Sequence, residues 1–303
     1  MIALASGISY LDLQFLNTPR VIATAVLSGP PGVALVDPGP TSSLGTLKAE
    51  LAQAGIAMRD VTTLLITHIH LDHSGAAGTL VRENPGLRVL VHANGAAHLI
   101  DPGKLLASAT RLYGDDMDRL WGEVAPVPAQ ALVVLNGGER VEAGGRSLEV
   151  AYTPGHASHH VSFFAPDAGI AFVGDTAGIR VVSDGEVVPA TPPPDVDLEA
   201  WDDSLDRIER WRPDSIFLAH FGPVAAVGSH ISTLRDRLQT ASRLVKASLA
   251  REETDAAREA WFAEEYRRHL RQSMNDTEAR VYEVAGRFDL SWRGLARYWR
   301  KRS

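Results

Sequence analysis

The chain has 303 residues, 45% of them hydrophobic and 22% charged, so it can bury a sizeable core and extensive disorder is excluded. Its net charge of −7 excludes a global attraction to nucleic acid or to an anionic membrane. The absence of cysteine excludes disulfides, thiolate catalysis, iron–sulfur clusters and zinc fingers. Because the first residues do not resemble a signal peptide and no apolar run is long enough to cross a membrane, we expect a cytoplasmic protein.

In chain order, the first two-thirds alternates short apolar runs with turns marked by glycine and proline. This pattern predicts an α/β body. A serine start, helical spacing and a terminal glycine predict a helix over 42–55, and a further helix is expected after Pro102 within 98–122. Strands are predicted within 21–29, 32–39, 61–67, 87–92, 131–155, 160–175 and 214–222.

The pattern changes near residue 230, where the spacing becomes helical and basic residues begin to outnumber acidic ones. We therefore divide the chain into a body over 1–229 and a helical C-terminal region over 230–303. The proline-rich stretch 189–197 is the most loop-like part, and we expect it to be an extended surface segment.

The sequence LLITHIHLDHSGAAG, residues 64–78, places His68, His70, Asp72 and His73 within six positions directly after an apolar strand. Alternation at the strand end puts both imidazoles of His68 and His70 on one side. Three imidazoles beside a carboxylate suit a divalent transition metal. A single His-x-His would favour an ordinary polar loop, but the full cluster favours metal.

Three further residues of ligand type stand where an apolar strand gives way to a loop. They are His156 in TPGHASHH, Asp175 in AFVGDTAG and His220 in SIFLAHFGP. Active sites on sheet scaffolds are commonly built at such positions. These residues are therefore candidates to complete the metal site.

Five motifs occur in a fixed order: VDPGP (36–40), THIHLDHSG (67–75), TPGH (153–156), GDT (174–176) and AHFGP (219–223). Together they resemble the metallo-β-lactamase superfamily of metallohydrolases. The resemblance covers about residues 15–225 and implies an αββα four-layer sandwich, here with a C-terminal helical extension. It implies two divalent metal ions, Zn²⁺ first, with Fe or Mn as alternatives.

The resemblance also assigns roles to individual residues. It implies that His68, His70 and His156 hold one metal, that Asp72, His73 and His220 hold the other, and that Asp175 bridges them. Asp72 and Asp175 are then the catalytic carboxylates that ligate and orient a metal-activated hydroxide. Asp37 and His160 are expected to give structural support, and His159 to face away from them on the opposite side of its segment.

The ligand set is similar to that of glyoxalase II-type thioesterases, and Asp175 together with the lack of cysteine disfavours a true β-lactamase. We therefore expect hydrolysis of a small-molecule ester, thioester or lactone. Three other readings stay open: a single-strand RNA endonuclease, a mononuclear iron persulfide dioxygenase and a binding module without turnover. The basic, aromatic segment 291–303 is the feature that a nucleic-acid partner would use.

In glyoxalase II-like and β-lactamase-like protein 2-like relatives, terminal helices cover the metal edge. By that resemblance Tyr266, Arg267, Arg268 and Tyr282, together with Arg287, are candidate substrate contacts. Their alternative role is helix packing and helix-surface charge. Trp201, Trp211 and Trp261 could form the face of a homodimer, although buried packing is the more ordinary role for tryptophan.

Overall fold

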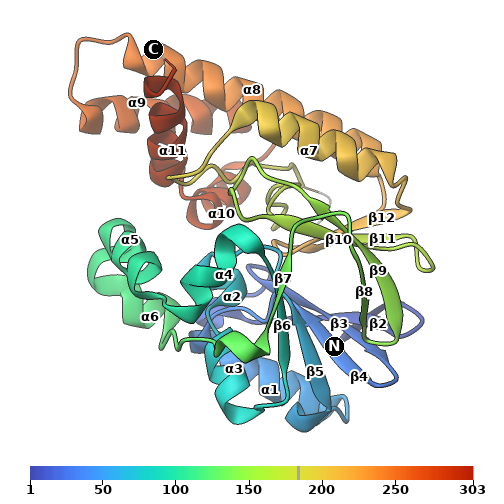
Figure 1. Ribbon diagram of the computed structural model, residues 1–303. Coiled ribbons are helices and arrows are strands. Elements are labelled where there is room, and N and C mark those ends of the chain that lie inside the picture. The colour runs from blue at the N-terminus through green and yellow to red at the C-terminus, as the bar shows by residue number, and fades with distance from the viewer. Residues whose placement is uncertain (183–184, 303) are drawn as a thin grey trace.

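The protein, described by a computed structural model over residues 1–182 and 185–302, contains two β-sheets packed face to face (Figure 1). Ser303, the last residue of the predicted helical region, lies outside the described residues. The first sheet has seven strands in sequence order: β1 (Ile2–Ala5), β2 (Ile8–Asp12), β3 (Ala23–Gly29), β4 (Gly32–Val36), β5 (Val61–Leu65), β6 (Arg88–His92) and β7 (Leu132–Leu135).

The second sheet has six strands in the order β13-β12-β11-β10-β9-β8. They are β8 (Arg140–Ala143), β9 (Arg146–Tyr152), β10 (Val161–Ala165), β11 (Ile170–Gly174), β12 (Ser215–Leu218) and β13 (Gly222–Val224). Every residue of the central strands β10 and β11 is buried, which explains their continuous apolar sequence. Phe163 and Phe172 of this sheet meet Leu27 of the first in the core between the sheets.

Helices cover the outer faces of both sheets. The described helices are α1 (Leu44–Gln53), α2 (Leu71–Ser74), α3 (Ala77–Glu83), α4 (Ala93–Ile100), α5 (Gly103–Tyr113), α6 (Met117–Trp121), α7 (Leu198–Arg210), α8 (Val227–Leu249), α9 (Asp255–Leu270), α10 (Asp276–Gly286) and α11 (Phe288–Arg300). Short 3₁₀ turns lie at Phe15–Asn17, Thr41–Ser43, Met58–Asp60, Gly114–Asp116 and Ala129–Ala131.

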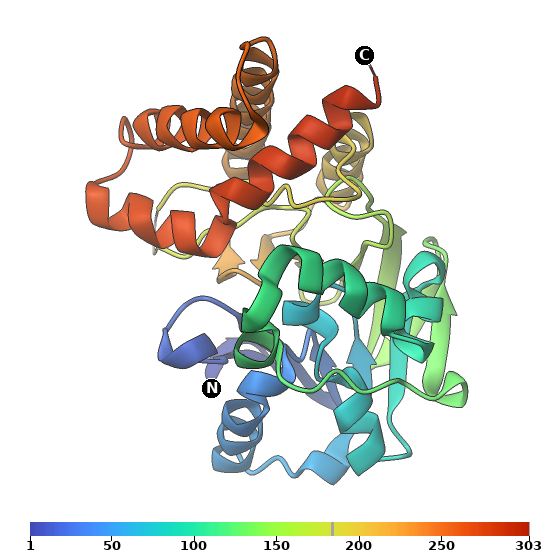
Figure 2. The same cartoon turned by 90° about the vertical axis from the view of Figure 1, so that its left-hand side faces the viewer.

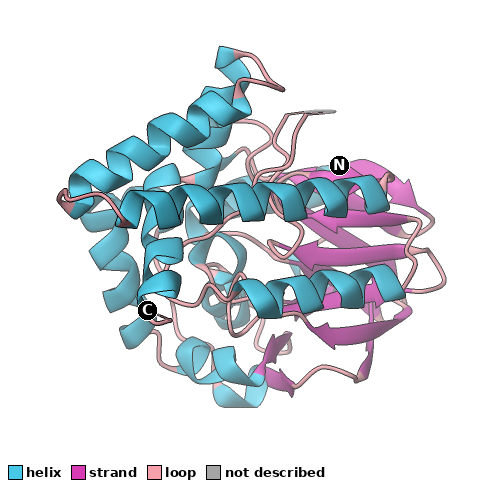
Figure 3. Ribbon diagram, turned by 90° about the horizontal axis from the view of Figure 1, so that it is seen from above, coloured by secondary structure: helices cyan, strands magenta, loops and turns pink. Residues whose placement is uncertain are grey.

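Two apolar clusters attach these helices to the sheets. Leu47 of α1 and Leu80 of α3 pack on the first sheet, whereas Trp201 of α7 and Leu234 of α8 pack on the second. The layers are thus helix, sheet, sheet and helix, which confirms the predicted αββα sandwich. Seen from above, α7 and α8 lie over the second sheet, and the other C-terminal helices, α9 to α11, extend beyond its edge (Figure 3).

The C-terminal helices have a core of their own, in which Phe262, Tyr266 and Tyr282 pack with Phe288 and Trp292. They stand on the side of the molecule from which α5 also projects (Figure 2). Helix α8 begins at Val227, three residues before the predicted boundary at 230. Among the described residues, none of the helices is both long and apolar enough to span a membrane.

The segment 189–197 is irregular, as the sequence predicts, but it is not an exposed surface segment. Pro189, Ala190 and Thr191 are buried. The Thr191 hydroxyl donates to the Ser291 carbonyl at 3.3 Å, and a side chain at Gly294 would collide with the Thr191 carbonyl. Proline cannot join a sheet ladder, so this segment packs beneath α11 without regular structure.

Candidate metal centre

The seven predicted ligands come from four separate segments, and the structure brings all of them to one edge of the sandwich. The segment after β5 supplies His68, His70, Asp72 and His73, with the last two on the short helix α2. His156 lies in the loop after β9, Asp175 directly follows β11, and His220 follows β12. Strand ends on the two sheets thus meet around one point.

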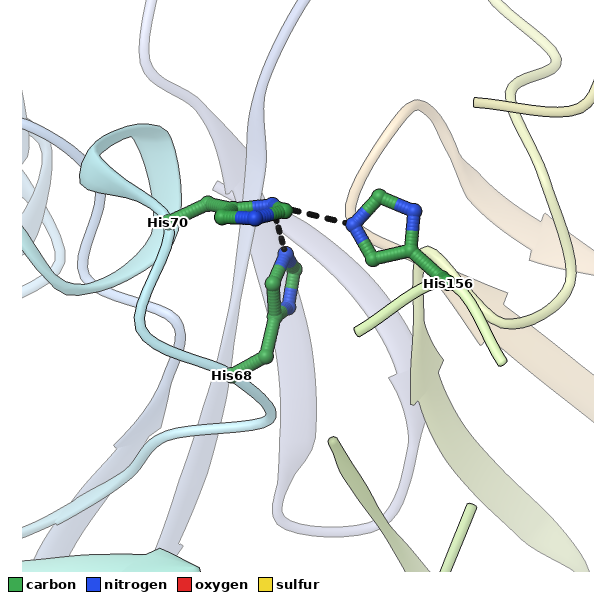
Figure 4. Close-up of side chains that lie close together, drawn as sticks. All are labelled: His68, His70 and His156. Carbon is green, nitrogen blue, oxygen red and sulfur yellow. Dashed lines mark hydrogen bonds between the residues drawn. The ribbon is translucent and has the colours of Figure 1, made fainter. Parts of the chain in front are cut away.

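His68, His70 and His156 form the first group of donors. Nε2 of His68 and Nε2 of His156 each lie 3.0 Å from Nδ1 of His70 (Figure 4). This spacing is close to the roughly 3.3 Å expected between nitrogens bound tetrahedrally at about 2.0–2.1 Å from one zinc ion. The geometry of this group therefore fits a divalent cation.

Asp72, His73 and His220 form the second group. Oδ2 of Asp72 lies 3.4 Å from Nε2 of His220 and 3.7 Å from Nε2 of His73. Burial alone would raise the pKa of Asp72, but His73 and His220 lower it to about 2. Asp72 is therefore anionic at neutral pH, as a metal ligand must be.

Asp175 stands between the two groups. Its Oδ1 lies 3.4 Å from Nε2 of His73 and 3.5 Å from Nε2 of His220, whereas its Oδ2 lies 3.7 Å from Nε2 of His156. Among the described residues, Oδ1 of Asp175 and Nε2 of His73 are sealed from solvent without a hydrogen-bond partner. Buried polar atoms of this kind are costly unless a further group satisfies them, and a cation between them would do so.

The opposite ring nitrogens of four ligands are fixed by hydrogen bonds. Nδ1 of His156 donates to the Ala190 carbonyl at 2.8 Å, Nδ1 of His220 donates to the Val21 carbonyl at 2.6 Å, and Nδ1 of His73 donates to the Asp37 carboxylate at 3.0 Å. Nδ1 of His68 faces the Thr67 hydroxyl at 3.1 Å. Each ring therefore directs its Nε2 atom toward the site, the orientation that metal binding needs.

Protonation of these rings follows their surroundings. Burial lowers the pKa of His68, His70 and His156, and neighbouring histidines lower those of His68 and His70 further. Burial also opposes the charged form of His73, but Asp175 and Asp72 raise its pKa well above the ordinary value. Cations binding at this second group would displace the proton that the carboxylates otherwise hold there.

Two supporting residues lie behind the ligands. Asp37 accepts hydrogen bonds from the Thr67 amide at 2.8 Å and the Thr67 hydroxyl at 2.7 Å. Nδ1 of His160 lies 2.9 Å from the Thr153 hydroxyl, and its ring stacks on that of His68 with centroids 4.9 Å apart. Both residues are buried and neither belongs to the described donor groups.

A cavity of about 320 Å³ opens over the metal centre. Its lining combines apolar side chains, which include Leu71, Leu105, Leu112, Trp121 and Leu290, with polar ones, which include Asn94, Ser158, His159 and Asp195. The cavity lies between α5 and the junction of α10 and α11, so the terminal helices do contribute to it. Its size and mixed lining suit a small organic molecule.

The structure does not bring Tyr266, Arg267, Arg268 or Tyr282 to this cavity. Tyr266 and Tyr282 are buried in the core of the helical region, and the Tyr282 hydroxyl donates to the Glu186 carbonyl. Arg267 pairs with Glu283 and Glu264, and Arg268 pairs with Glu265. Helix packing and charge pairs within α9 or between α9 and α10 therefore account for all four side chains, and only Arg287 of the candidates lines the cavity.

Sequence reasoning missed most of the cavity wall. Lys104, Tyr113 and Trp121 belong to α5 and α6, where nothing in the sequence distinguishes them from ordinary helix residues. His159 also lines the cavity, whereas its neighbour His160 does not. Its closeness to His156 in the sequence was a signal that it could lie near the metal centre. The direction of its ring, however, depends on packing against the loop that carries His68 and His70.

Trp201, Trp211 and Trp261 all make packing contacts within the chain, which is the ordinary role expected for tryptophan. Trp201 is fully buried, and its indole N–H donates to the Thr176 carbonyl at 2.6 Å. Trp211 stacks on Phe164, and Trp261 lies under the Arg251 guanidinium. Intramolecular packing therefore explains these side chains.

Comparison with known proteins identifies relatives along most of the chain. The family model for the Metallo-beta-lactamase superfamily matches residues 18–220. A metallo-beta-lactamase fold-containing protein of Sulfurisphaera tokodaii is 28% identical over 210 residues, which cover 68% of this chain and 75% of that protein. The crystal structure of a metallo-beta-lactamase family protein from Thermus thermophilus superposes with a TM-score of 0.74 at 26% identity, over 99% of this chain and 95% of that one.

A hydroxyacylglutathione hydrolase of Legionella pneumophila is 26% identical over 155 residues. The matched part is 50% of this chain and 46% of the hydrolase, so the chain spans less than half of that relative's length. The similarity does not extend to the whole of either protein.

Proposed function

Because this chain belongs to the metallo-beta-lactamase superfamily, as the match over residues 18–220 shows, we propose that it is a dinuclear metal-dependent hydrolase of small esters, thioesters or lactones. The observation that carries this proposal is Asp175. One of its oxygens faces His73 and His220 and the other faces His156, so it can join two cations in one site.

The donor set fits two divalent cations, which would lower the pKa of a bound water and polarise a substrate carbonyl. The chain's own residues contribute the rest. Asp72, whose side chain is 24% exposed against 5% for Asp175, is the more open of the two ligand carboxylates and can orient the attacking water. The apolar wall of Leu105, Leu112 and Leu290 holds the acyl part and excludes bulk water.

Several observations favour a small acyl substrate over RNA. Basic residues in and directly after the last helix are engaged: Arg293 pairs with Glu259, and Arg302 pairs with Asp197 and Glu199. Arg297 donates to the Pro194 carbonyl. Charges that are already neutralised contribute little to phosphate binding, and the curated hydroxyacylglutathione hydrolases support thioester chemistry at 26–30% identity.

The test is metal analysis of the purified protein combined with a screen of thioesters, lactones, esters and short single-stranded RNA. We expect two divalent ions per chain and turnover of acyl substrates. Two bound metals with turnover of RNA and none of the acyl compounds would overturn the proposal. One iron per chain, with oxygen uptake in the presence of glutathione persulfide, would also overturn it.

A further inference from the structure

The ring of His159 forms part of the cavity wall directly beside the metal ligands. It makes an edge contact with His70, with centroids 5.6 Å apart, and lies parallel to His68 at 6.1 Å. His159 is 8% exposed and lines the cavity, yet it belongs to none of the described donor groups. It is therefore a titratable side chain at the site for which metal binding gives no role.

One hydrogen bond fixes which nitrogen of His159 carries the proton. The backbone N–H of Ile69 donates to Nδ1 of His159 at 3.3 Å, so Nδ1 is the acceptor. In a neutral imidazole the other nitrogen is then the donor. No described residue accepts a hydrogen bond from Nε2, and this atom is not among the buried nitrogens sealed from solvent. The Nε2–H group is thus available to a molecule in the cavity.

The segment that carries His159 is held rigidly. The Ser158 carbonyl accepts hydrogen bonds from the Asn94 amide at 2.7 Å and the Tyr152 hydroxyl at 2.9 Å, and the Ser158 hydroxyl donates to Asp195 at 2.5 Å. These bonds tie the loop to three other elements. A donor that is fixed in this way does not have to reorganise when charge develops near it. Little free energy is therefore spent on reorganisation during the reaction.

We propose that His159 is a catalytic residue whose Nε2–H donates a hydrogen bond to the carbonyl oxygen of the scissile acyl group. The donor stabilises the negative charge that this oxygen gains when water attacks. It also orients the substrate, with its polar part against Asn94 and Ser158 and its apolar part against Leu105 and Leu112. This assignment rests on the proposed acyl hydrolase function.

Two substitutions separate the role of the Nε2–H donor from that of Nδ1, which accepts the hydrogen bond from the Ile69 amide. In His159→Asn the amide oxygen can still accept from the Ile69 N–H, but no group reaches the position of Nε2. In His159→Gln the longer side chain places an amide N–H near that position. With the metal-loaded enzyme and a butyryl thioester, we expect His159→Asn to lower kcat about tenfold to a hundredfold, and His159→Gln to stay within about threefold of wild type.

Both variants should retain two metals per chain, and His269→Phe on α9, outside the cavity, should change nothing. His159→Asn with wild-type kcat, or His159→Gln as slow as His159→Asn at full metal content, would overturn the role.

If the wild type hydrolyses no acyl compound, the proposed function fails, and octanoate binding to the metal-loaded protein then tests His159. Weaker binding by His159→Asn but not by His159→Gln supports the donor, and equal binding by all three overturns it.

Discussion

Nδ1 of His73 donates a hydrogen bond to Oδ2 of Asp37 at 3.0 Å, with both side chains sealed from solvent. The same carboxylate also accepts from the amide and the hydroxyl of Thr67. Thr67 lies between the end of β5 and His68, so one buried carboxylate fixes the orientation of a ligand ring and the start of the ligand loop. Asp37 itself has a φ of +51°, a conformation that aspartate tolerates better than most residues.

This relationship predicts the effect of Asp37→Asn. The carboxylate now accepts from three donors, which are the Thr67 amide, the Thr67 hydroxyl and Nδ1 of His73. The asparagine amide has only one oxygen, so either His73 or Thr67 loses its hydrogen-bond acceptor. We expect the affinity for the second metal to fall about tenfold to a hundredfold, measured by competition with a chelator. Asp118→Asn, at an exposed position of α6, is the matched control, and equal affinities in both variants would contradict a supporting role for Asp37.

Replacement of Asp175 by Ala should reduce the metal content from two ions to at most one and abolish turnover. The reason is that its two oxygens face different donor groups, and no other described carboxylate does so. Elemental analysis and a thioester assay on the same sample measure both quantities. Wild-type turnover at full metal content would refute the assignment. His70→Ala, which removes one donor of the first group only, should likewise lose metal and activity together.

Removal of metal should lower the melting temperature. Ligands that bind only the folded state stabilise it in proportion to the logarithm of their concentration over Kd, and here a cation would also relieve the buried, unsatisfied Oδ1 of Asp175. We expect dialysis against EDTA to lower Tm by several degrees and zinc to restore it. The Asp175→Ala protein, measured by the same calorimetry, should respond much less; an identical response would place the stabilising ion elsewhere.

Gly155, directly before His156, should not tolerate alanine. Its φ is +130°, and a Cβ there would lie 2.3 Å from Cα of Trp201. Because neither the backbone conformation nor the contact can be accommodated without movement, Gly155→Ala should destabilise the protein by more than about 1 kcal/mol. Gly228→Ala, where α8 leaves open space, should be neutral or stabilising in the same urea titration. Comparable stabilities for the two variants would rule out this close packing.

Ala285 tests whether the terminal helices shape the cavity. It lies in the last turn of α10 and lines the cavity. Ala285→Leu adds bulk to the wall, so kcat/KM should fall more for octanoyl than for acetyl thioesters, with metal content unchanged. Ala260→Leu on the exposed side of α9 should leave the ratio between the two substrates unaltered. A similar ratio in both variants would show that acyl chains bind elsewhere.

Much of the fold and the metal centre follows from local sequence. The central strands are continuous apolar runs because both faces of β10 and β11 are buried. The ligands occur at strand ends because strand ends that meet at one edge converge in space. The cluster from His68 to His73 therefore indicated a metal site without any knowledge of the rest of the molecule.

The cavity wall could not be predicted in this way. Tyr266 and Tyr282 have the residue type of substrate contacts, but they pack inside the helical region, whereas the unremarkable residues Leu105 and Tyr113 line the cavity. Helical spacing gives the residues on one face of a helix but not the element that this face meets. The same limit left the position of His159 in the cavity lining unpredicted.

By itself, then, the sequence determined the α/β body, its helical C-terminal region and the residues able to bind metal, since each depends on periodicity or on ligand chemistry within a few positions. Only the tertiary structure decided that Ile69 fixes the His159 ring and that the α10–α11 junction faces α5. These relationships join residues far apart in the chain, and they are set by how the layers pack.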